Sequence, residues 1–181
     1  MKNEDIIRRL KLAISSVIIK DNWLLINNLS EQSISHKLAE YLQYLFVYYD
    51  IDCEYNGNIE VEKGRKRIIA LKRELRKAKI ELSKTEKKDR ENELINRAVF
   101  PDIIIHQRGT NERNLCVIEV KKSTSNRIAC AYDEIKLQSY TTDYYGNGLR
   151  YQLGAYIEFE VNQENPKYNI KYFKGGKQYN L

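Results

Sequence analysis

The apolar run LCVIEV, which begins at Leu115, constrains the fold more than any other stretch of this chain. Successive side chains of a β-strand point to opposite faces of its sheet. Leu115 and Val117 share one face, and both are apolar. Cys116, Ile118 and Val120 share the other face, which is apolar as well. A strand of this kind belongs inside a sheet that is covered on both sides, so the chain must supply helices for both faces.

Periodic apolar residues predict those helices. Spacings of three and four positions predict amphipathic helices over 4–19, 30–48 and 128–143. Ser30 suits the N-cap of the second helix. Alternating or continuous apolar runs predict strands in the remaining segments, namely 50–56, 99–106, 115–122, 150–161 and, as a final edge strand, 167–176.

Length and composition set the domain organisation. A chain of 181 residues with 42% apolar residues can build one well-buried core. We therefore expect one α/β domain over residues 1–181, in which a central mixed sheet is flanked by helices. Residues 1–29 form its N-terminal helix and connector.

The basic segment 60–97 stands apart from this pattern. Its residues 62–93 carry the whole of the chain's net charge of +6. No Pro or Gly occurs from 65 to 99, and apolar residues recur at helical spacing, which predicts a helix or helical hairpin inserted after the first core strand. The apolar seam consists of Ile68, Leu71, Leu75, Ala78 and Leu82.

Three roles for this predicted insertion remain open. The first is a solvated arm, the second is a contact for nucleic acid, and the third is a coiled-coil element that forms a homodimer. The basic balance of the chain favours a polyanionic partner. The nucleic-acid contacts would then include Lys72, Arg73, Arg76 and Lys77.

The cysteines and the N-terminus bear on location. Cys53, Cys116 and Cys130 lie in apolar segments without metal-ligand spacing, so we expect reduced core residues of a cytoplasmic protein. Charged residues interrupt the first 23 positions, which predicts neither a signal peptide nor an apolar span of about 20 residues. We expect no association with a membrane.

The two central strands place an acid pair at one end of the predicted sheet. If the turn between them is GTNE, with Arg108 opposite Arg113, then Asp102 lies directly across from Glu119. Two carboxylates about 5 Å apart at the end of a covered strand repel each other unless one is protonated or a cation lies between them. Mg²⁺ accepts one or two carboxylates together with waters and phosphate oxygens. The alternative is an ordinary strand end with a cross-strand ion pair.

These residues resemble the PD-(D/E)xK nuclease superfamily, which includes restriction endonucleases, junction resolvases and repair exonucleases. The match consists of Pro101-Asp102 and Glu119-Val120-Lys121 in a strand-turn-strand context. The resemblance implies a restriction endonuclease-like fold in which Asp102, Glu119 and the Val120 carbonyl bind Mg²⁺ or Mn²⁺. It also implies that Lys121 orients or activates the attacking water. The segment 60–97 departs from the family pattern, because it separates the first two core strands.

Members of this superfamily often add a glutamate from the first core helix. Glu31 shares a helical face with Leu38, Leu42 and Leu45, whereas Glu40 lies half a turn away. We therefore expect Glu31 to join the metal ligands and Glu40 to face solvent. An acid in the first helical turn also complements the helix dipole, whatever its further role.

The remaining candidates are substrate contacts and two histidines. Lys122 directly follows the motif, and Lys136 is preferred to Gln138 as the polar contact from the next helix. His36 is predicted to lie on the surface. His106 is predicted to be a strand histidine with its hydrogen bonds satisfied.

The sequence thus predicts a metal-dependent nuclease that hydrolyses phosphodiester bonds, with DNA as the expected substrate. Two alternatives from other classes remain. The chain is a catalytically inactive nucleic-acid-binding or protein-interaction module on the same fold, or its basic segment is an oligomerisation element.

Overall fold

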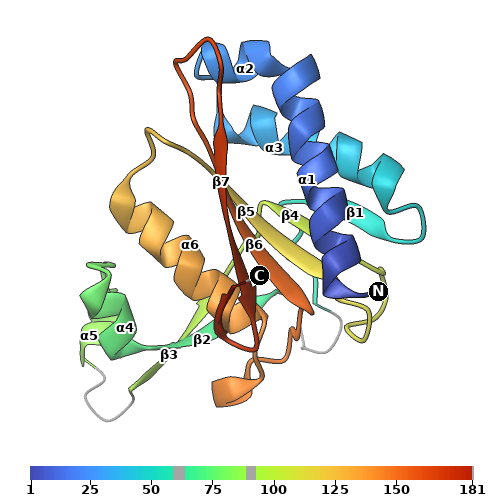
Figure 1. Ribbon diagram of the computed structural model, residues 1–181. Coiled ribbons are helices and arrows are strands. Elements are labelled where there is room, and N and C mark those ends of the chain that lie inside the picture. Colours follow the sequence, from blue (N-terminus) through green and yellow to red (C-terminus); the bar gives the residue numbers. More distant parts are fainter. Residues whose placement is uncertain (59–63, 89–92, 181) are drawn as a thin grey trace.

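The computed structural model describes residues 1–58, 64–88 and 93–180. Its centre is a sheet with the strand order β1-β4-β5-β6-β7-β8 (Figure 1). β5 and β6 run parallel and every other neighbouring pair is antiparallel, so the predicted mixed sheet is confirmed. The strands are β1 Asp50–Cys53, β4 Ile103–His106, β5 Cys116–Lys122, β6 Leu153–Phe159, β7 Tyr168–Lys174 and β8 Lys177–Tyr179.

The register of the central hairpin is as predicted. Ile103 pairs with Ile118, and Ile105 pairs with Cys116. This register places Asp102, one residue before β4, level with Glu119 on β5. The polar turn between the strands therefore fixes which acids lie at the end of the sheet.

Helices cover both faces of the sheet, as the apolar strand requires. The helices are α1 Asn3–Lys20, α2 Asn22–Ile26, α3 Glu31–Leu45 and α6 Arg127–Tyr140. Ile118 packs in one core cluster with residues of α1 and α3, whereas Val117 packs in a second cluster with Leu137 and Tyr140 of α6. Ser30 caps α3 as predicted, because its Oγ accepts a hydrogen bond from Ser33 N at 3.1 Å.

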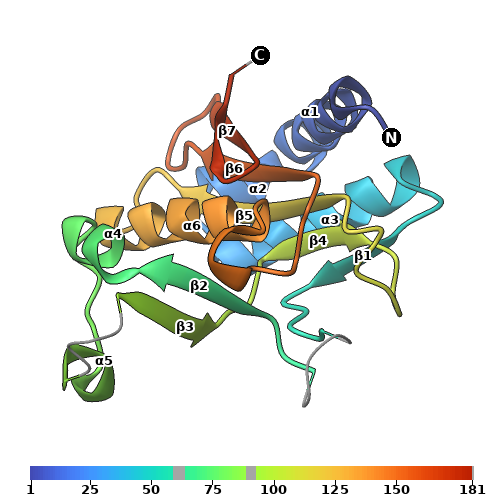
Figure 2. The same ribbon diagram turned by 90° about the horizontal axis from the view of Figure 1, so that it is seen from below.

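The segment between β1 and β4, called the insert below, differs from its prediction. It contains β2 Arg67–Leu71, α4 Lys72–Lys77, α5 Lys84–Lys88 and β3 Leu94–Ala98, and β2 pairs with β3 in a separate antiparallel sheet (Figure 2). The predicted long helix or helical hairpin is therefore wrong. Residues 60–63 and 89–92 of the predicted segment lie outside the described residues.

Packing against α6 explains why strands replace the predicted helix. Ile68 is buried in the cluster that contains Val117, while Leu75, Leu82 and Ile95 form a small core of the insert. Ile135 of α6 packs against that small core. The apolar seam is thus divided between the strand β2, the short helix α4 and the residues between α4 and α5, because tertiary packing outweighs a local helical pattern.

Two smaller expectations also need correction. β7 is not the edge strand, because Gly175 and Gly176 have φ angles of +58° and +77° and turn the chain into β8. Cys116 and Cys130 are buried as predicted, but Cys53 is exposed because it ends the edge strand β1. None of the described helices has the length and apolar composition needed to cross a bilayer.

Candidate active site

Six charged side chains meet where β5 ends, and we call them the acid–lysine cluster. Four elements supply them: the residue before β4, the end of β5, the first turn of α3 and the middle of α6. The members are Glu31, Asp102, Glu119, Lys121, Asp133 and Lys136. The predicted convergence of Asp102, Glu119 and Lys121 at one end of the sheet is confirmed.

Asp102 is fixed by the backbone of the opposite strand. Its Oδ2 accepts a hydrogen bond from Val120 N at 2.7 Å. Burial raises the pKa of Asp102 above its usual value, and the Val120 hydrogen bond only partly offsets this effect. The hairpin register thus holds a poorly solvated carboxyl group beside the end of β5.

Glu119 is the most enclosed acid of the cluster. It has no exposed surface, and neither of its carboxylate oxygens has a hydrogen bond of good geometry. Lys136 Nζ lies 2.9 Å from Oε1 as an ion pair. Burial raises the pKa of Glu119 well above its usual value. Lys136 opposes this rise, and the charges of Asp102 and Asp133 add to it.

Lys121 lies between acids from two helices. Its Nζ is 3.0 Å from Glu31 Oε2 and 3.0 Å from Asp133 Oδ2. It also donates a hydrogen bond to Val120 O at 3.2 Å. Burial lowers the pKa of Lys121, but the neighbouring Asp133 and Asp102 outweigh burial and raise it, so the ammonium stays charged. The carbonyl that the family resemblance assigns to a metal thus accepts from this lysine.

Asp133 is the cluster member that the sequence analysis missed. It is 5% exposed and joins the two lysines, because Lys136 Nζ lies 2.7 Å from its Oδ1. For Lys136, burial lowers the pKa, but Glu119 and Asp133 raise it above its usual value. A signal was available in the sequence. Asp133 falls on the same helical face as Leu137 and Tyr140, where an acid needs a partner.

The helical phase predicted for the two glutamates of α3 is confirmed. Glu31 contacts Lys121, and its Oε1 accepts hydrogen bonds from Ser125 Oγ and, at 3.4 Å, from Lys122 N. Partial burial opposes ionisation, but Ser125 and Lys121 hold the pKa of Glu31 below its usual value. Glu40 is exposed and pairs with Lys37.

Of the predicted substrate contacts, some lie in the cluster and others lie elsewhere. Lys136 belongs to the cluster, whereas Gln138 lines a separate hollow near the end of α6. Lys122 Nζ donates to Leu29 O at 2.9 Å, so the connector holds its side chain. Among the predicted contacts of the insert, Arg73, Arg76 and Lys77 are exposed. The prediction that Lys72 contacts nucleic acid needs correction, because Lys72 is only 3% exposed and cannot present its charge to a polyanion.

Both histidine predictions are confirmed. His36 is exposed on α3. His106 is buried, and its Nε2 lies 2.9 Å from Asp52 Oδ2. Burial lowers the pKa of His106, and Asp52 opposes this effect. His106 therefore serves the packing of β1 against β4, away from the cluster.

Two hollows border the cluster, and Glu31 lines both of them. One of about 330 Å³ is lined by Glu31, Asp102 and the exposed His36. The other, of about 420 Å³, is lined by Glu31, Lys121 and Lys122. Acids dominate the charged lining of the first hollow and lysines that of the second, which we call the basic hollow.

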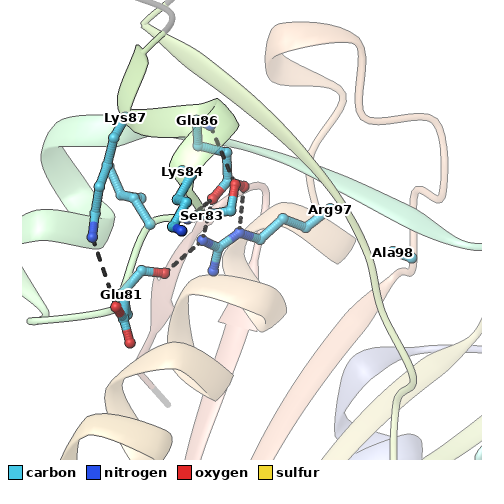
Figure 3. A pocket seen from close by; sticks show the side chains of 8 residues that line it. Glu81, Ser83, Lys84, Glu86, Lys87, Arg97 and Ala98 are labelled. Carbon is cyan, nitrogen blue, oxygen red and sulfur yellow. Dashed lines mark hydrogen bonds and ion pairs between the residues drawn. The ribbon is translucent and has the colours of Figure 1, made fainter.

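A larger hollow of about 610 Å³ lies in the insert (Figure 3). Four of the five charged groups that line it form two ion pairs. Arg97 donates two hydrogen bonds to the Glu86 carboxylate, at 2.8 and 2.9 Å, and a third to Glu81 O. Lys87 lies 3.7 Å from Glu81. Size alone does not make this hollow a chemical site, because its strongest charges are already paired.

Two carboxylates of the acid–lysine cluster have the chemistry of ligands for a hard cation. Glu119 offers two buried oxygens, of which Oε1 lies beside the Lys136 ammonium, and Asp102 adds a second carboxylate from the residue before β4. In the part of the chain that the structure describes, no three His, Cys, Asp or Glu side chains lie close enough together to hold a metal ion. The arrangement fits Mg²⁺, which accepts one or two carboxylates with waters and phosphate oxygens, better than an ion that needs an all-protein cage.

Comparisons with known proteins add no further information about this site. No family model, no curated protein and no solved structure matches the chain. The function is therefore inferred from the residues and their geometry.

Proposed function

We propose that this protein is a metal-dependent nuclease of the PD-(D/E)xK type, which hydrolyses phosphodiester bonds in nucleic acid, with DNA as the expected substrate. The proposal includes a restriction endonuclease-like arrangement of the core. That arrangement is supported by the element order α3, β1, β4, β5, α6, β6 and by the position of Asp102, Glu119 and Lys121 within it.

One observation carries the proposal. Glu119 is a fully buried carboxylate whose only close cationic partner is Lys136 at Oε1, and it lies level with Asp102, the residue before the paired strand β4. Burying such a group costs free energy unless it is protonated or paired with a cation. A bound divalent cation would offset the free-energy cost of burying this carboxylate, and Mg²⁺ or Mn²⁺ can bind carboxylates in this way.

The chain's own residues then divide the remaining work. When bound, a divalent ion would polarise a phosphoryl oxygen and lower the pKa of a bound water. Lys121 carries a fixed positive charge beside Asp102, where it offsets negative charge that develops on the phosphate. Glu31 and Asp133 hold the Lys121 ammonium from two helices. Lys122 and the basic hollow beside Glu31 would face the substrate backbone.

A catalytically inactive nucleic-acid-binding or protein-interaction module is the second candidate. It is favoured by the ion pair between Lys136 and Glu119, which partly neutralises the carboxylate without any metal. In that case the cluster is a structural network that ties α3 and α6 to β5, and the chain binds its partner without cleaving it.

A cleavage assay with matched variants separates the two candidates. Purified protein is incubated with Mg²⁺ or Mn²⁺ and with linear, circular, single-stranded and branched substrates. The nuclease proposal expects cleavage that Lys121→Ala lowers by orders of magnitude while nucleic-acid affinity changes modestly. Lys37→Ala removes an exposed lysine of α3 and should leave cleavage unchanged. Absence of cleavage on every substrate, together with no stabilisation by either ion, would falsify the nuclease proposal.

A further inference from the structure

Two neighbouring hollows meet at Tyr144, beyond the C-terminal end of α6. One has a volume of about 200 Å³ and is lined by residues of the insert, α6 and the turn before β8. The other, of about 280 Å³, is lined by Thr142, Arg150 and Gly175, among others. Tyr144 lines both hollows and is 60% exposed. An aromatic side chain therefore stands between two cavities on an open surface.

The backbone beneath this tyrosine is held firmly. Asn147 is buried and its side chain bridges two segments, because Nδ2 donates to Tyr144 O at 3.0 Å and to Ile69 O at 2.9 Å. Its Oδ1 accepts from Ile69 N at 2.8 Å. The next residue after Tyr144, Tyr145, has a φ angle of 61°, which is unusual for an aromatic residue and is kept only where the surroundings impose it. Tyr144 is thus presented on a fixed turn, which lowers the entropy lost when a ligand binds.

Polar groups line the two hollows together with Tyr144. Among the described residues, neither the Gln138 amide in the smaller hollow nor the Glu74 carboxylate beside it has an ion pair or a side-chain hydrogen bond. Lys177 is exposed at the same hollow, and Arg150 is exposed at the other. Tyr144 is therefore flanked by one amide, one carboxylate and two cations.

We propose that this surface binds a segment of single-stranded nucleic acid, with one base stacked on Tyr144 and its phosphates beside Arg150 and Lys177. Base–aromatic stacking combined with a cationic surface is the usual means of holding single strands. The smaller hollow lies below the roughly 300 Å³ at which pockets for whole small molecules begin, so it suits a single base of a polymer. Gln138 and Glu74 both offer acceptor oxygens, which favours a base that carries an exocyclic amino group.

This site is separate from the acid–lysine cluster. Asp133 and Lys136 face the sheet, whereas Gln138 lines the hollow that α6 forms with the insert. Binding at Tyr144 needs no metal ion and no cleavage. Binding at Tyr144 is therefore independent of the proposed nuclease activity, and it can be tested with a chelator present.

Fluorescence anisotropy with labelled short oligonucleotides in EDTA tests the inference. Wild-type protein should bind single strands more tightly than a duplex of the same sequence. Mixed adenine and cytosine strands should bind more tightly than strands of thymine alone. Tyr144→Ala should weaken single-strand binding by about 5-fold to 150-fold, the range expected for one stacked base, and Tyr144→Phe should retain it. Tyr48, which is 89% exposed and lines neither hollow, supplies the matched control Tyr48→Ala.

The cations supply a second, independent readout. Arg150→Gln and Lys177→Gln should each reduce the slope of log affinity against log salt by about 0.7 for every phosphate that the variant no longer neutralises. Unchanged binding by Tyr144→Ala in a chain with a wild-type melting curve would overturn the proposal. So would tighter binding of the duplex, or no measurable binding of any single strand. Should Tyr144→Ala fail to fold, the salt slopes of the two surface variants decide the matter.

Discussion

Asp133 offers the sharpest test of how the acid–lysine cluster is held together. It is 5% exposed and lies 3.0 Å from Lys121 and 2.7 Å from Lys136. Asp133→Asn keeps the shape of the side chain but removes the charge that the two buried ammonium groups share. Breaking a buried ion pair from one side costs about 3–5 kcal/mol. Lys121 keeps Glu31, and loss of the Asp133 charge favours ionisation of Glu119 beside Lys136, so we expect the lower end, about 3 kcal/mol.

Thermal and urea unfolding measure this loss directly. For a chain of this length, about 3 kcal/mol corresponds to a fall in Tm of about 6–12 °C. The matched control is the adjacent Glu134→Gln, which breaks an exposed pair with Lys171 and should cost less than about 1 kcal/mol. Asp133→Glu tests geometry, since it keeps the charge but moves it along the side chain. Equal stability of Asp133→Asn, Glu134→Gln and wild type would refute a stabilising role for the network.

Other contacts lead to three further expectations. Glu31→Gln should reduce any metal-dependent cleavage by at least about tenfold because it weakens the hold on Lys121, whereas Glu40→Gln should leave the rate unchanged. Arg97 lowers the pKa of Glu86 to about 2, so this pair stabilises the fold above the usual glutamate pKa and loses that effect as pH falls toward 2. Urea unfolding at several pH values should therefore show that the free energy of unfolding falls less at acidic pH in Arg97→Ala than in wild type. If the insert binds nucleic acid, gel-shift titrations should show a flatter salt dependence, and no loss of fold, after glutamine replaces its exposed cations Arg73, Arg76 and Lys77.

The central hairpin and the phase of α3 were predictable because strong local rules decide both. A two-residue period and a polar turn fix the register of Ile103 against Ile118, and a 3.6-residue period separates Glu31 from Glu40. Each of these features depends on residues close together in the chain.

The insert was not predictable by the same rules. Ile68 fits a helical seam as well as it fits a strand, and the choice depends on contacts with Val99 and Ile104, which no local pattern encodes. The role of Asp133 in the cluster was also not predicted, because it depends on a contact between residues of different elements. Its function in the cluster depends on Lys121 of β5, and only the folded arrangement of α6 against the sheet brings the two together.

The charge balance of the acid–lysine cluster connects its stability with its proposed chemistry. When ionised, its four carboxylates exceed its two ammonium groups by two negative charges, and most of this charge is buried. Protonation of Asp102 and Glu119 would relieve the excess, in the direction of the raised pKa of both groups, and a divalent cation would relieve it as well. Protons and cation therefore compete, so Mg²⁺ or Mn²⁺ should raise the Tm more at alkaline than at acidic pH. Glu119→Gln should abolish that gain and leave the metal-free protein as stable as wild type or more so. A Tm that neither ion changes at any pH would mean that the cluster binds no divalent cation, and the cluster would then be the structural network of a binding module.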